Sequence, residues 1–298
     1  MDSDLNVGTL SGLMGNLRVG DNSPIRIMGV INLTSNSFYS GSVRKKPEDV
    51  LETALKMEEE GANVIDIGAR STAPYRTYDI STRIEQKLLV EAIKVLIRKI
   101  NIPISVDTTR SGPAKAALDE GATILNDAFG LTQKDGHSLA ALSAEYESSL
   151  IITAHEIRPK SGGNPIDRVK QALERSVELA ISNGVQRRRI IIDPGIGFFS
   201  DKQISNIEWN CTVLSRLSYF RSFRFPICVG VSRKRFIGIL VGNKPAEQRM
   251  FGSLAATAIA VYNGCHIIRT HDVAETLQAV RVAAEIRKQE KGLSHIRS

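Results

Sequence analysis

Aromatic residues and long apolar runs are scarce in this chain. Phe, Trp and Tyr make up only 5% of its 298 residues, whereas hydrophobic residues make up 42%, so we expect an aliphatic core. No segment approaches about 18 consecutive apolar residues, and the first residues lack a basic patch followed by an apolar run, which argues against membrane insertion and secretion. We therefore expect a cytoplasmic protein. No proline-rich linker divides the chain, and its length fits one domain.

Cysteine usage and charge each exclude a class of protein. Cys211, Cys228 and Cys265 are odd in number, widely spaced and set among apolar residues, which favours buried free thiols over disulfides or a zinc site. The net charge is +7, but the basic residues are spread along the chain and few aromatic side chains are present to stack on bases. We therefore expect no nucleic-acid partner. Three consecutive arginines at 187–189 are interpreted as a solvated turn.

Eight short β-rich runs alternate with helical stretches along the chain. The helical stretches have start and stop signals, such as Pro47 and Gly61, around apolar residues at helical spacing. This rhythm predicts an α/β protein with the (β/α)8 barrel fold, also called a TIM barrel. The β-rich runs cover residues 25–32, 63–69, 103–108, 124–127, 150–155, 190–196, 226–232 and 266–272.

The predicted barrel spans residues 25–298. Residues 1–24 contain four glycines and a weak alternation of apolar residues. We interpret this N-terminal extension as a short hairpin that plugs the lower end of the barrel and carries no chemistry.

Each predicted strand closes on a polar residue. In a (β/α)8 barrel the loops after the strands build the active site. Asp and Asn also cap helices, so any single position has a structural explanation, but the full set marks an active face. The residues are Asn32, Asp66, Asp107, Asn126, Asp127, His155, Asp193, Ser232 and His271.

Two basic groups follow the last two β-rich runs. Residues 232–235 read Ser-Arg-Lys-Arg, and Arg269 and His271 end the final run. These runs are neighbours in a closed barrel, so both groups should face the site. Clustered Arg and Lys side chains bind phosphoryl oxygens strongly, and barrels often place a phosphate site at this position.

Several strand-end motifs occur in a fixed order. They are Ile-Met-Gly-Val-Ile-Asn-Leu-Thr at 27–34, Asp-Ile-Gly at 66–68, Ser-Val-Asp-Thr at 105–108, Asn-Asp at 126–127, Asp-Pro-Gly-Ile-Gly-Phe at 193–198, Ser-Arg-Lys at 232–234 and Arg-Thr-His-Asp at 269–272. In this order they resemble the dihydropteroate synthase family. The resemblance implies a barrel enzyme that joins 6-hydroxymethyl-7,8-dihydropterin pyrophosphate to an arylamine, usually 4-aminobenzoate, and releases pyrophosphate. It also implies Mg²⁺ as cofactor and a homodimer formed through the late helices around residues 254–261.

The resemblance assigns roles to individual residues. A pterin edge is rich in N–H donors, which buried carboxylates and amides hold well, and the implied pterin-binding residues are Asp107, Asn126, Asp193, Phe198 and Lys234. The implied pyrophosphate-binding residues are Asn32, Arg269 and His271, with Asn32 also the magnesium ligand. The implied arylamine-binding residues are Thr72, Pro74, Ser232 and Arg235. Lys234, Arg269 and His271 are the implied catalytic residues, and the amine attacks with its own lone pair, so no nucleophilic side chain is needed.

Two loops depart from the bacterial pattern. Residues 34–41 lack both acids that bacterial members usually carry there, and residues 70–75 read Arg-Ser-Thr-Ala-Pro-Tyr where Glu-Ser-Thr-Arg-Pro-Gly is usual. Both loops look more like archaeal relatives, some of which use 4-(β-D-ribofuranosyl)aminobenzene 5'-phosphate as the amine. Arg235 replaces a residue that is usually serine and adds a guanidinium suited to phosphate. We therefore expect an archaeal-type member and leave the amine open.

Two other functions fit part of the pattern. A corrinoid-linked methyltetrahydropterin methyltransferase domain shares the pterin-binding barrel, but it binds no pyrophosphate and has no use for the two basic groups. A noncatalytic pterin-binding relative would keep Asp193 and Asn126 and lose the loop chemistry.

Overall fold

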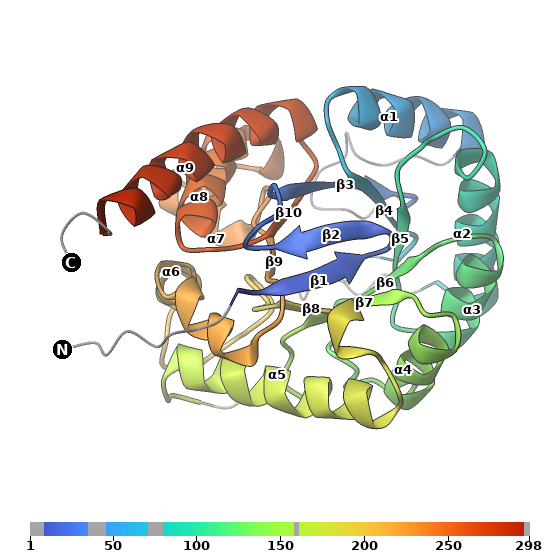
Figure 1. Cartoon of the computed structure of the whole chain (residues 1–298), viewed down its shortest axis with the longest axis horizontal. Helices are drawn as coiled ribbons and strands as arrows, with labels where there is room; N and C mark the ends of the chain where they lie inside the picture. The colour runs from blue at the N-terminus through green and yellow to red at the C-terminus, as the bar shows by residue number, and fades with distance from the viewer. Residues whose placement is uncertain (1–8, 35–45, 71–79, 158–160, 295–298) are drawn as a thin grey trace.

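Eight parallel strands form the centre of the molecule. The computed structural model describes residues 9–34, 46–70, 80–157 and 161–294. The strands are β3 (Arg26–Asn32), β4 (Val64–Gly68), β5 (Ile104–Asp107), β6 (Ile124–Asp127), β7 (Ser149–Thr153), β8 (Ile190–Asp193), β9 (Cys228–Gly230) and β10 (Ile267–Thr270). They pair in the order β8-β7-β6-β5-β4-β3-β10-β9. Each expected run overlaps one of these strands, and Figure 1 shows them inside a ring of helices.

The sheet closes on itself between β8 and β9. Ile192 forms a parallel bridge with Ile227, and the Ile192 N–H donates to the carbonyl of Pro226 at 3.0 Å. The closed sheet with its surrounding helices is the (β/α)8 barrel that the sequence predicts.

The helices begin where their sequence signals lie. α1 (Pro47–Glu59) has Pro in its first turn and carries Glu48 and Asp49 at the positive end of its dipole. α5 (Pro165–Ser182) also has Pro in its first turn, and the side chain of Asn164 caps it by accepting a hydrogen bond from the N–H of Ile166. The other helices are α2 (Thr82–Leu96), α3 (Ser111–Asp119), α4 (Gly136–Glu145), α6 (Asn206–Ser215), α7 (Arg235–Leu240), α8 (Met250–Tyr262) and α9 (Val273–Ser294).

An antiparallel hairpin covers the end of the barrel at which the strands begin. It consists of β1 (Ser11–Met14) and β2 (Leu17–Gly20), and Figure 1 shows it lying across the middle of the helical ring. Met14 and Val19 are buried against apolar residues of the barrel interior such as Ile191. Burial of these side chains accounts for the apolar alternation in the extension and leaves the other end of the barrel for the polar residues.

The barrel interior changes from apolar to polar along the strands. Residues two apart on a strand point to the same side, so Val64 and Asp66 share a face of β4, and Ile267 and Arg269 share a face of β10. Val64 and Ile267 belong to the apolar cluster under the hairpin, whereas Asp66 is fully buried in the next layer. The regular pleat of the strands therefore places polar groups inside the barrel toward its carboxyl end.

Three further expectations concern the surface and the thiols. Cys228 and Cys265 are buried free thiols, but the expectation of burial is wrong for Cys211, which is exposed. The buried residues of α6 are Trp209, Asn210, Val213 and Leu214, so position 211 falls on the opposite face of that helix. The three arginines form a short 3-10 turn (Arg187–Arg189) before β8, with no buried residue. Among the helices of the described segments, none is long and apolar enough to cross a membrane.

Candidate active site

A buried ion-pair network lies inside the barrel at the carboxyl ends of the strands. Nε and Nη2 of Arg269 lie 2.7 and 2.6 Å from Oδ2 of Asp66. Nη2 also lies 2.9 Å from Oδ2 of Asp107, and the side-chain amide of Asn126 donates to Oδ2 of Asp66 at 3.1 Å. These four residues come from four different strands, so the closed sheet, and not local sequence, brings them together.

Two oxygens of this network have no partner in the described part of the chain. Oδ1 of Asp66 and Oδ1 of Asp107 are buried without a hydrogen bond. Leaving a buried acceptor unsatisfied costs about 1–3 kcal/mol, and more when it is charged, and native proteins satisfy nearly all such groups. The two oxygens therefore mark a place suited to a ligand that presents N–H or O–H donors.

Burial controls the protonation of Asp107. It raises the pKa of Asp107 to about 7, against the opposing attraction of Arg269 and with added repulsion from Asp66. The carboxyl group is thus close to its titration midpoint at neutral pH, and a ligand that donates hydrogen bonds to it would favour the ionised form. A buried acid with this property at the carboxyl ends of barrel strands is typical of a functional site.

The turn after β8 holds another buried carboxylate. Oδ1 of Asp193 accepts a hydrogen bond from the N–H of Gly195 at 2.8 Å. Burial raises the pKa of Asp193, whereas this hydrogen bond and the charge of Lys234 oppose the rise. Gly195 adopts a φ of +71°, and a Cβ there would lie 2.5 Å from the carbonyl oxygen of Ala154, so glycine is required for this tight turn.

Lys234 lies against the same turn. Its Nζ donates to the carbonyl of Ile196 at 2.6 Å and lies 4.3 Å from the centre of the Phe198 ring, within the range of a cation–π contact. Burial lowers the pKa of Lys234 to about 8, although the charge of Asp193 opposes this shift. Gly197 permits the approach, since a Cβ at Gly197 would lie only 2.8 Å from Cδ of Lys234.

His271 connects the ends of β10, β9 and β3. Its Nδ1 lies 2.9 Å from Oγ of Ser232, and its Nε2 lies 3.5 Å from Nδ2 of Asn32. Burial, followed by repulsion from Arg269, lowers the pKa of His271 to about 3. His271 is therefore a neutral imidazole and not the cation expected from the sequence. A neutral imidazole can still donate one N–H to an anion.

The residues on either side of Lys234 point elsewhere. The backbone φ of Arg233 is +56°, and its guanidinium is buried against Asp272, with Nε to Oδ2 at 2.9 Å, and against the carbonyl of Ala246 at 3.1 Å. Arg233 therefore anchors the segment before α8, and the expectation that it faces the site is wrong. Arg235 is the first residue of α7 and is exposed.

Two other polar residues at strand ends stabilise loops. Asp127 accepts hydrogen bonds from the N–H groups of Phe129 and Leu131 at 3.0 and 2.6 Å, a turn-stabilising role that is common for Asp. His155 packs edge-on against Phe129, and its Nδ1 lies 2.9 Å from Oγ1 of Thr132. These contacts explain both residues without a ligand.

The structure adds two residues to the candidate site. Asp66 carries a polar signal in the sequence, but its place at the centre of the Arg269 network depends on which strands are neighbours. Arg70 follows β4 and donates a hydrogen bond to Oγ1 of Thr109. Its positive charge also favours the ionised form of Asp107 and so lowers the pKa of that carboxyl group. In the sequence, Arg70 is marked only as a polar residue directly after a predicted strand. Thr72 and Pro74, expected at the arylamine site, lie outside the described residues.

Fold and site together define a class of protein. Carboxylates, an amide, a lysine and a histidine meet at the carboxyl ends of a (β/α)8 barrel, which is where enzymes of this fold bind their substrates. Residues 28–271 match the family model described as pterin binding enzyme. The chain is therefore a pterin-binding enzyme.

Individual relatives narrow this class. The dihydropteroate synthase of Synechocystis is 33% identical over 263 residues, which cover 86% of this chain and 88% of that protein. A solved dihydropteroate synthase from Coxiella burnetii in complex with pteroic acid has a TM-score of 0.82 and 32% identity, covering 93% of this chain and 98% of that one. The dihydropteroate synthase of Xanthomonas albilineans with 4-aminobenzoic acid has a TM-score of 0.82 and 29% identity, covering 94% and 98%. The chain belongs to the dihydropteroate synthase family, whose members are transferases that form a C–N bond.

Proposed function

We propose that the protein condenses 6-hydroxymethyl-7,8-dihydropterin pyrophosphate with 4-aminobenzoate and releases pyrophosphate. The observation that carries this proposal is the pair of unpartnered buried oxygens, Oδ1 of Asp66 and Oδ1 of Asp107, in the described part of the barrel. The amino-pyrimidinone edge of a pterin presents several N–H donors, which ionised carboxylates accept in strong, charge-assisted hydrogen bonds. Asn126 lies beside them and adds an amide.

Asp193, at the end of β8, and two residues that follow β8 and β9 complete the proposed pterin site. The carboxylate of Asp193 accepts from ring N–H groups, and Lys234 donates to the ring's acceptors. Phe198 supplies apolar surface beside the ring, consistent with its position against Lys234. Every one of these groups is held in place by the glycine-rich turn or by the strand before it.

The chemistry requires separation of charge. As the C–O bond to pyrophosphate breaks, its electrons leave with the pyrophosphate and positive charge develops on the methylene carbon. The lone pair of the arylamine forms the new C–N bond, and the proton that the nitrogen then loses passes to water or to the departing pyrophosphate. Arg269 supplies the positive charge on the pyrophosphate side, and the neutral His271 and the amide of Asn32 supply N–H donors. Because Arg269 is also paired with Asp66 and Asp107, it connects the ring site to the leaving-group site.

Asn32 is the proposed magnesium ligand. Its Nδ2 faces His271. Its Oδ1 lies beside Gly68, 3.8 Å from where a Cβ on that glycine would stand. One amide oxygen suits Mg²⁺, which keeps several waters and binds phosphate oxygens together with few protein ligands. Within residues 9–34, 46–70, 80–157 and 161–294, no group of three His, Cys, Asp or Glu side chains could hold a metal. A bound magnesium would neutralise phosphate charge and would take its other ligands from the pyrophosphate and from water.

The choice of 4-aminobenzoate rests on the relatives and on Arg235. The similar Xanthomonas albilineans structure is described with 4-aminobenzoic acid, and the relatives compared above are bacterial. Arg235 is exposed at the start of α7, so its guanidinium offers a phosphate contact at the surface and not in the buried part of the site. The archaeal-type motifs at 34–41 and 70–75 lie mainly outside the described residues. The phosphorylated amine therefore remains the alternative substrate to test.

We also propose that the protein is a homodimer formed through α8 and α9. Phe251 and Ile259 of α8 are 79% and 50% exposed, and Val282 and Ile286 of α9 are 63% and 56% exposed. Residues at spacings of four and eight share one helix face, and the two helices lie side by side in Figure 1. Exposed large apolar side chains on two neighbouring helices support a protein interface there. Light scattering on Ile259→Glu and on the wild type tests it: a dimeric variant would contradict the proposed interface.

Pyrophosphate release tests the proposed reaction. With the pyrophosphorylated pterin and 4-aminobenzoate, the protein should release pyrophosphate at a rate that depends on both substrates, and mass spectrometry should detect dihydropteroate. Release without the amine would indicate a hydrolase. Pterin binding without release would indicate the noncatalytic relative, and methyl transfer from a methyltetrahydropterin would indicate the corrinoid-linked function.

A further inference from the structure

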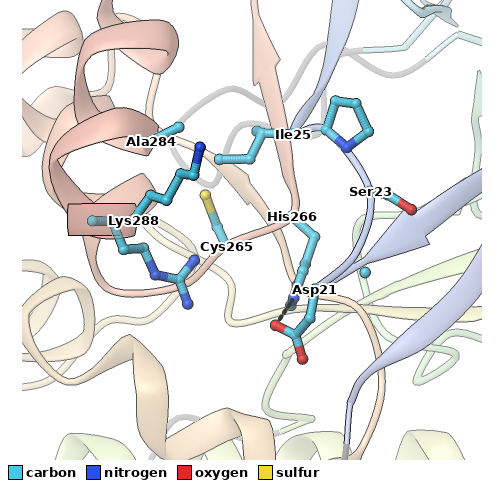
Figure 2. A pocket seen from close by; sticks show the side chains of 10 residues that line it. Asp21, Ser23, Ile25, Cys265, His266, Ala284 and Lys288 are labelled. Carbon is cyan, nitrogen blue, oxygen red and sulfur yellow. Dashed lines mark hydrogen bonds and ion pairs between the residues drawn. The ribbon is translucent and has the colours of Figure 1, made fainter. Parts of the chain in front are cut away.

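A pocket lies at the end of the barrel opposite the candidate active site. Its volume is about 330 Å³, and its walls come from the link between β2 and β3, the two residues before β10 and the second half of α9. Figure 2 shows Ile25, Cys265 and Ala284 pointing toward one space, with Asp21 and His266 in contact below them. None of these residues takes part in the proposed reaction.

Asp21 is a fully occupied carboxylate. Arg221 binds it with both nitrogens, Nη1 to Oδ1 at 2.9 Å and Nη2 to Oδ2 at 2.8 Å. The N–H of Leu10 donates to Oδ2 at 2.8 Å. Although burial acts in the opposite direction, contacts with His266 and Arg221 hold the pKa of Asp21 well below its usual range. The charge of Asp21 is therefore offset by Arg221 and leaves no acceptor free for a cation.

His266 adds no charge to the pocket. The N–H of Ile227 donates to Nδ1 of His266 at 3.0 Å, which places the proton of the imidazole on Nε2. That nitrogen lies 3.4 Å from Oδ1 of Asp21. Burial also lowers the pKa of His266, so the imidazole is neutral at physiological pH.

Arg287 is a half-buried cation of the pocket lining with few hydrogen-bond partners in the described part of the chain. Within the described segments its guanidinium donates one long hydrogen bond, from Nη1 to the carbonyl of Val261 at 3.4 Å. Burial and repulsion from Arg221 lower the pKa of Arg287, whereas the nearby charges of Asp21 and Glu290 oppose this shift. Nη2 lies over Gly264, where a Cβ would be only 2.9 Å away. A guanidinium has five N–H donors, so most of those of Arg287 are available to a ligand.

We propose that this pocket binds a small organic anion, with a carboxylate or phosphate on Arg287 and an apolar body against Ile25, Cys265 and Ala284. Asp21 is offset by Arg221 and His266 is neutral, so Arg287 and its neighbour Lys288 give the lining an excess positive charge. A guanidinium binds either type of anion through two parallel hydrogen bonds. The volume lies at the lower end of the range for ligand pockets, which fits a body of about one ring. Burial raises the pKa of the Cys265 thiol to about 12, so Cys265 provides an inert wall.

Calorimetry with three related probes tests the proposal. Phenyl phosphate and benzoate carry the two anions on the same ring, and benzyl alcohol is their neutral counterpart. We expect one or both anions to bind and benzyl alcohol not to bind, and the comparison of the two anions identifies the preferred group. Arg287→Gln should weaken binding by about tenfold or more, since it removes a charge-assisted pair. Arg281→Gln, exposed on the same helix, is the matched control and should leave binding unchanged.

A bromine label fixes the location, because the active site also accepts anions. A crystal soaked with 4-bromophenyl phosphate should show anomalous signal beside Arg287. Signal only at the carboxyl ends of the strands, or equal affinity in wild type and Arg287→Gln, would overturn the proposal. If Arg287→Gln does not fold, Lys288→Gln, which changes an exposed side chain, should weaken binding by about threefold. Unchanged binding in that variant would count against the proposal.

Discussion

Nη2 of Arg269 lies 2.9 Å from Oδ2 of Asp107, so the principal cation of the site is paired with a carboxylate proposed to bind the pterin. The same nitrogen lies 2.6 Å from Oδ2 of Asp66. Both carboxylates are buried, and a buried charge without a partner is strongly destabilising. Arg269 therefore holds the two carboxylates of the site in place, in addition to its proposed role toward the leaving group.

We predict that Arg269→Ala lowers the free energy of unfolding by about 3 kcal/mol, the scale for breaking a buried ion pair from one side. It should also weaken binding of both the alcohol and the pyrophosphate forms of the pterin, because Asp66 and Asp107 lose the group that orients them. Urea denaturation measures the first effect and calorimetry the second. An Arg269→Ala variant as stable as wild type would show that the two carboxylates are held in another way.

We predict that His271→Ala weakens binding of the pyrophosphorylated pterin but not of the pterin alcohol. Its neutral imidazole can donate a hydrogen bond to the anion, so the variant should lose about tenfold in affinity for the pyrophosphorylated pterin and almost none for the alcohol. Calorimetry with both ligands, each with and without Mg²⁺, provides the comparison. Equal losses for the two ligands would place His271 on the ring side of the site.

We predict that Gly197→Ala weakens pterin binding, whereas Gly242→Ala does not. Both glycines have positive φ, +84° and +89°, so both variants bear similar backbone strain of about 1 kcal/mol. A Cβ at Gly197 would lie 2.8 Å from Cδ of Lys234, whereas a Cβ at Gly242 meets nothing within 4 Å. Thermal unfolding should shift similarly in the two variants while pterin affinity falls only in the first. A parallel loss of affinity would mean that strain alone matters.

We predict a bell-shaped dependence of pterin affinity on pH. Burial raises the pKa of Asp107 to about 7, so the carboxylate is protonated and accepts hydrogen bonds poorly below that pH. Burial lowers the pKa of Lys234 to about 8, so its charge is lost above that pH. Affinity should therefore rise toward pH 7 and fall beyond pH 8, by at most about tenfold per pH unit for each group. Asp107→Asn should remove the part of the acid limb near pH 7 and leave a contribution from Asp193, whose pKa burial also raises, whereas Lys234→Arg should remove the alkaline limb. An acid limb unchanged in Asp107→Asn would assign it to another group.

We predict that wild type prefers 4-aminobenzoate to the ribofuranosyl-aminobenzene phosphate in direct competition, with products separated by mass. If Arg235 instead binds the phosphate of the second amine, that amine would win, and Arg235→Ser would reduce its kcat/KM advantage by about tenfold. The preference measured in wild type and in Arg235→Ser therefore decides between a bacterial-type and an archaeal-type amine.

The sequence predicts where strands and site residues lie along the chain better than it predicts where side chains point or how they are protonated. The strand at 124–127 matches β6, and the polar residues at strand ends locate the active face, because one-dimensional patterns determine both. Lys234 and Arg233 are adjacent, yet one lies at the site and the other is buried against Asp272. Arg233 has a positive φ, which turns the chain at this residue. The residue types of this segment give no signal for that backbone conformation.

Partner choice and protonation depend on the assembled barrel. Asp66, Asp107 and Arg269 meet through strand neighbours that are far apart in the chain, so their pairing is absent from any local motif. His271 is neutral because of burial and of repulsion by Arg269, which the sequence alone does not describe. The expected burial of Cys211 is wrong for a simpler reason. Apolar neighbours in the sequence do not determine which face of a helix is buried.

The junction between β8 and β9 has a consequence for the dynamics of the barrel. The two strands meet through the Ile192–Ile227 bridge, whereas every other pair of neighbouring strands aligns three or more residues. With the fewest backbone hydrogen bonds, this seam should exchange its amide hydrogens with deuterium sooner than the rest of the sheet. Asp193 ends one strand of the seam and Lys234 follows the other, so a pterin bound by both would cross-link them. Bound substrate would then hold β8 and β9 together and stabilise the closed barrel. Slower deuterium uptake along β8 and β9 would report its binding.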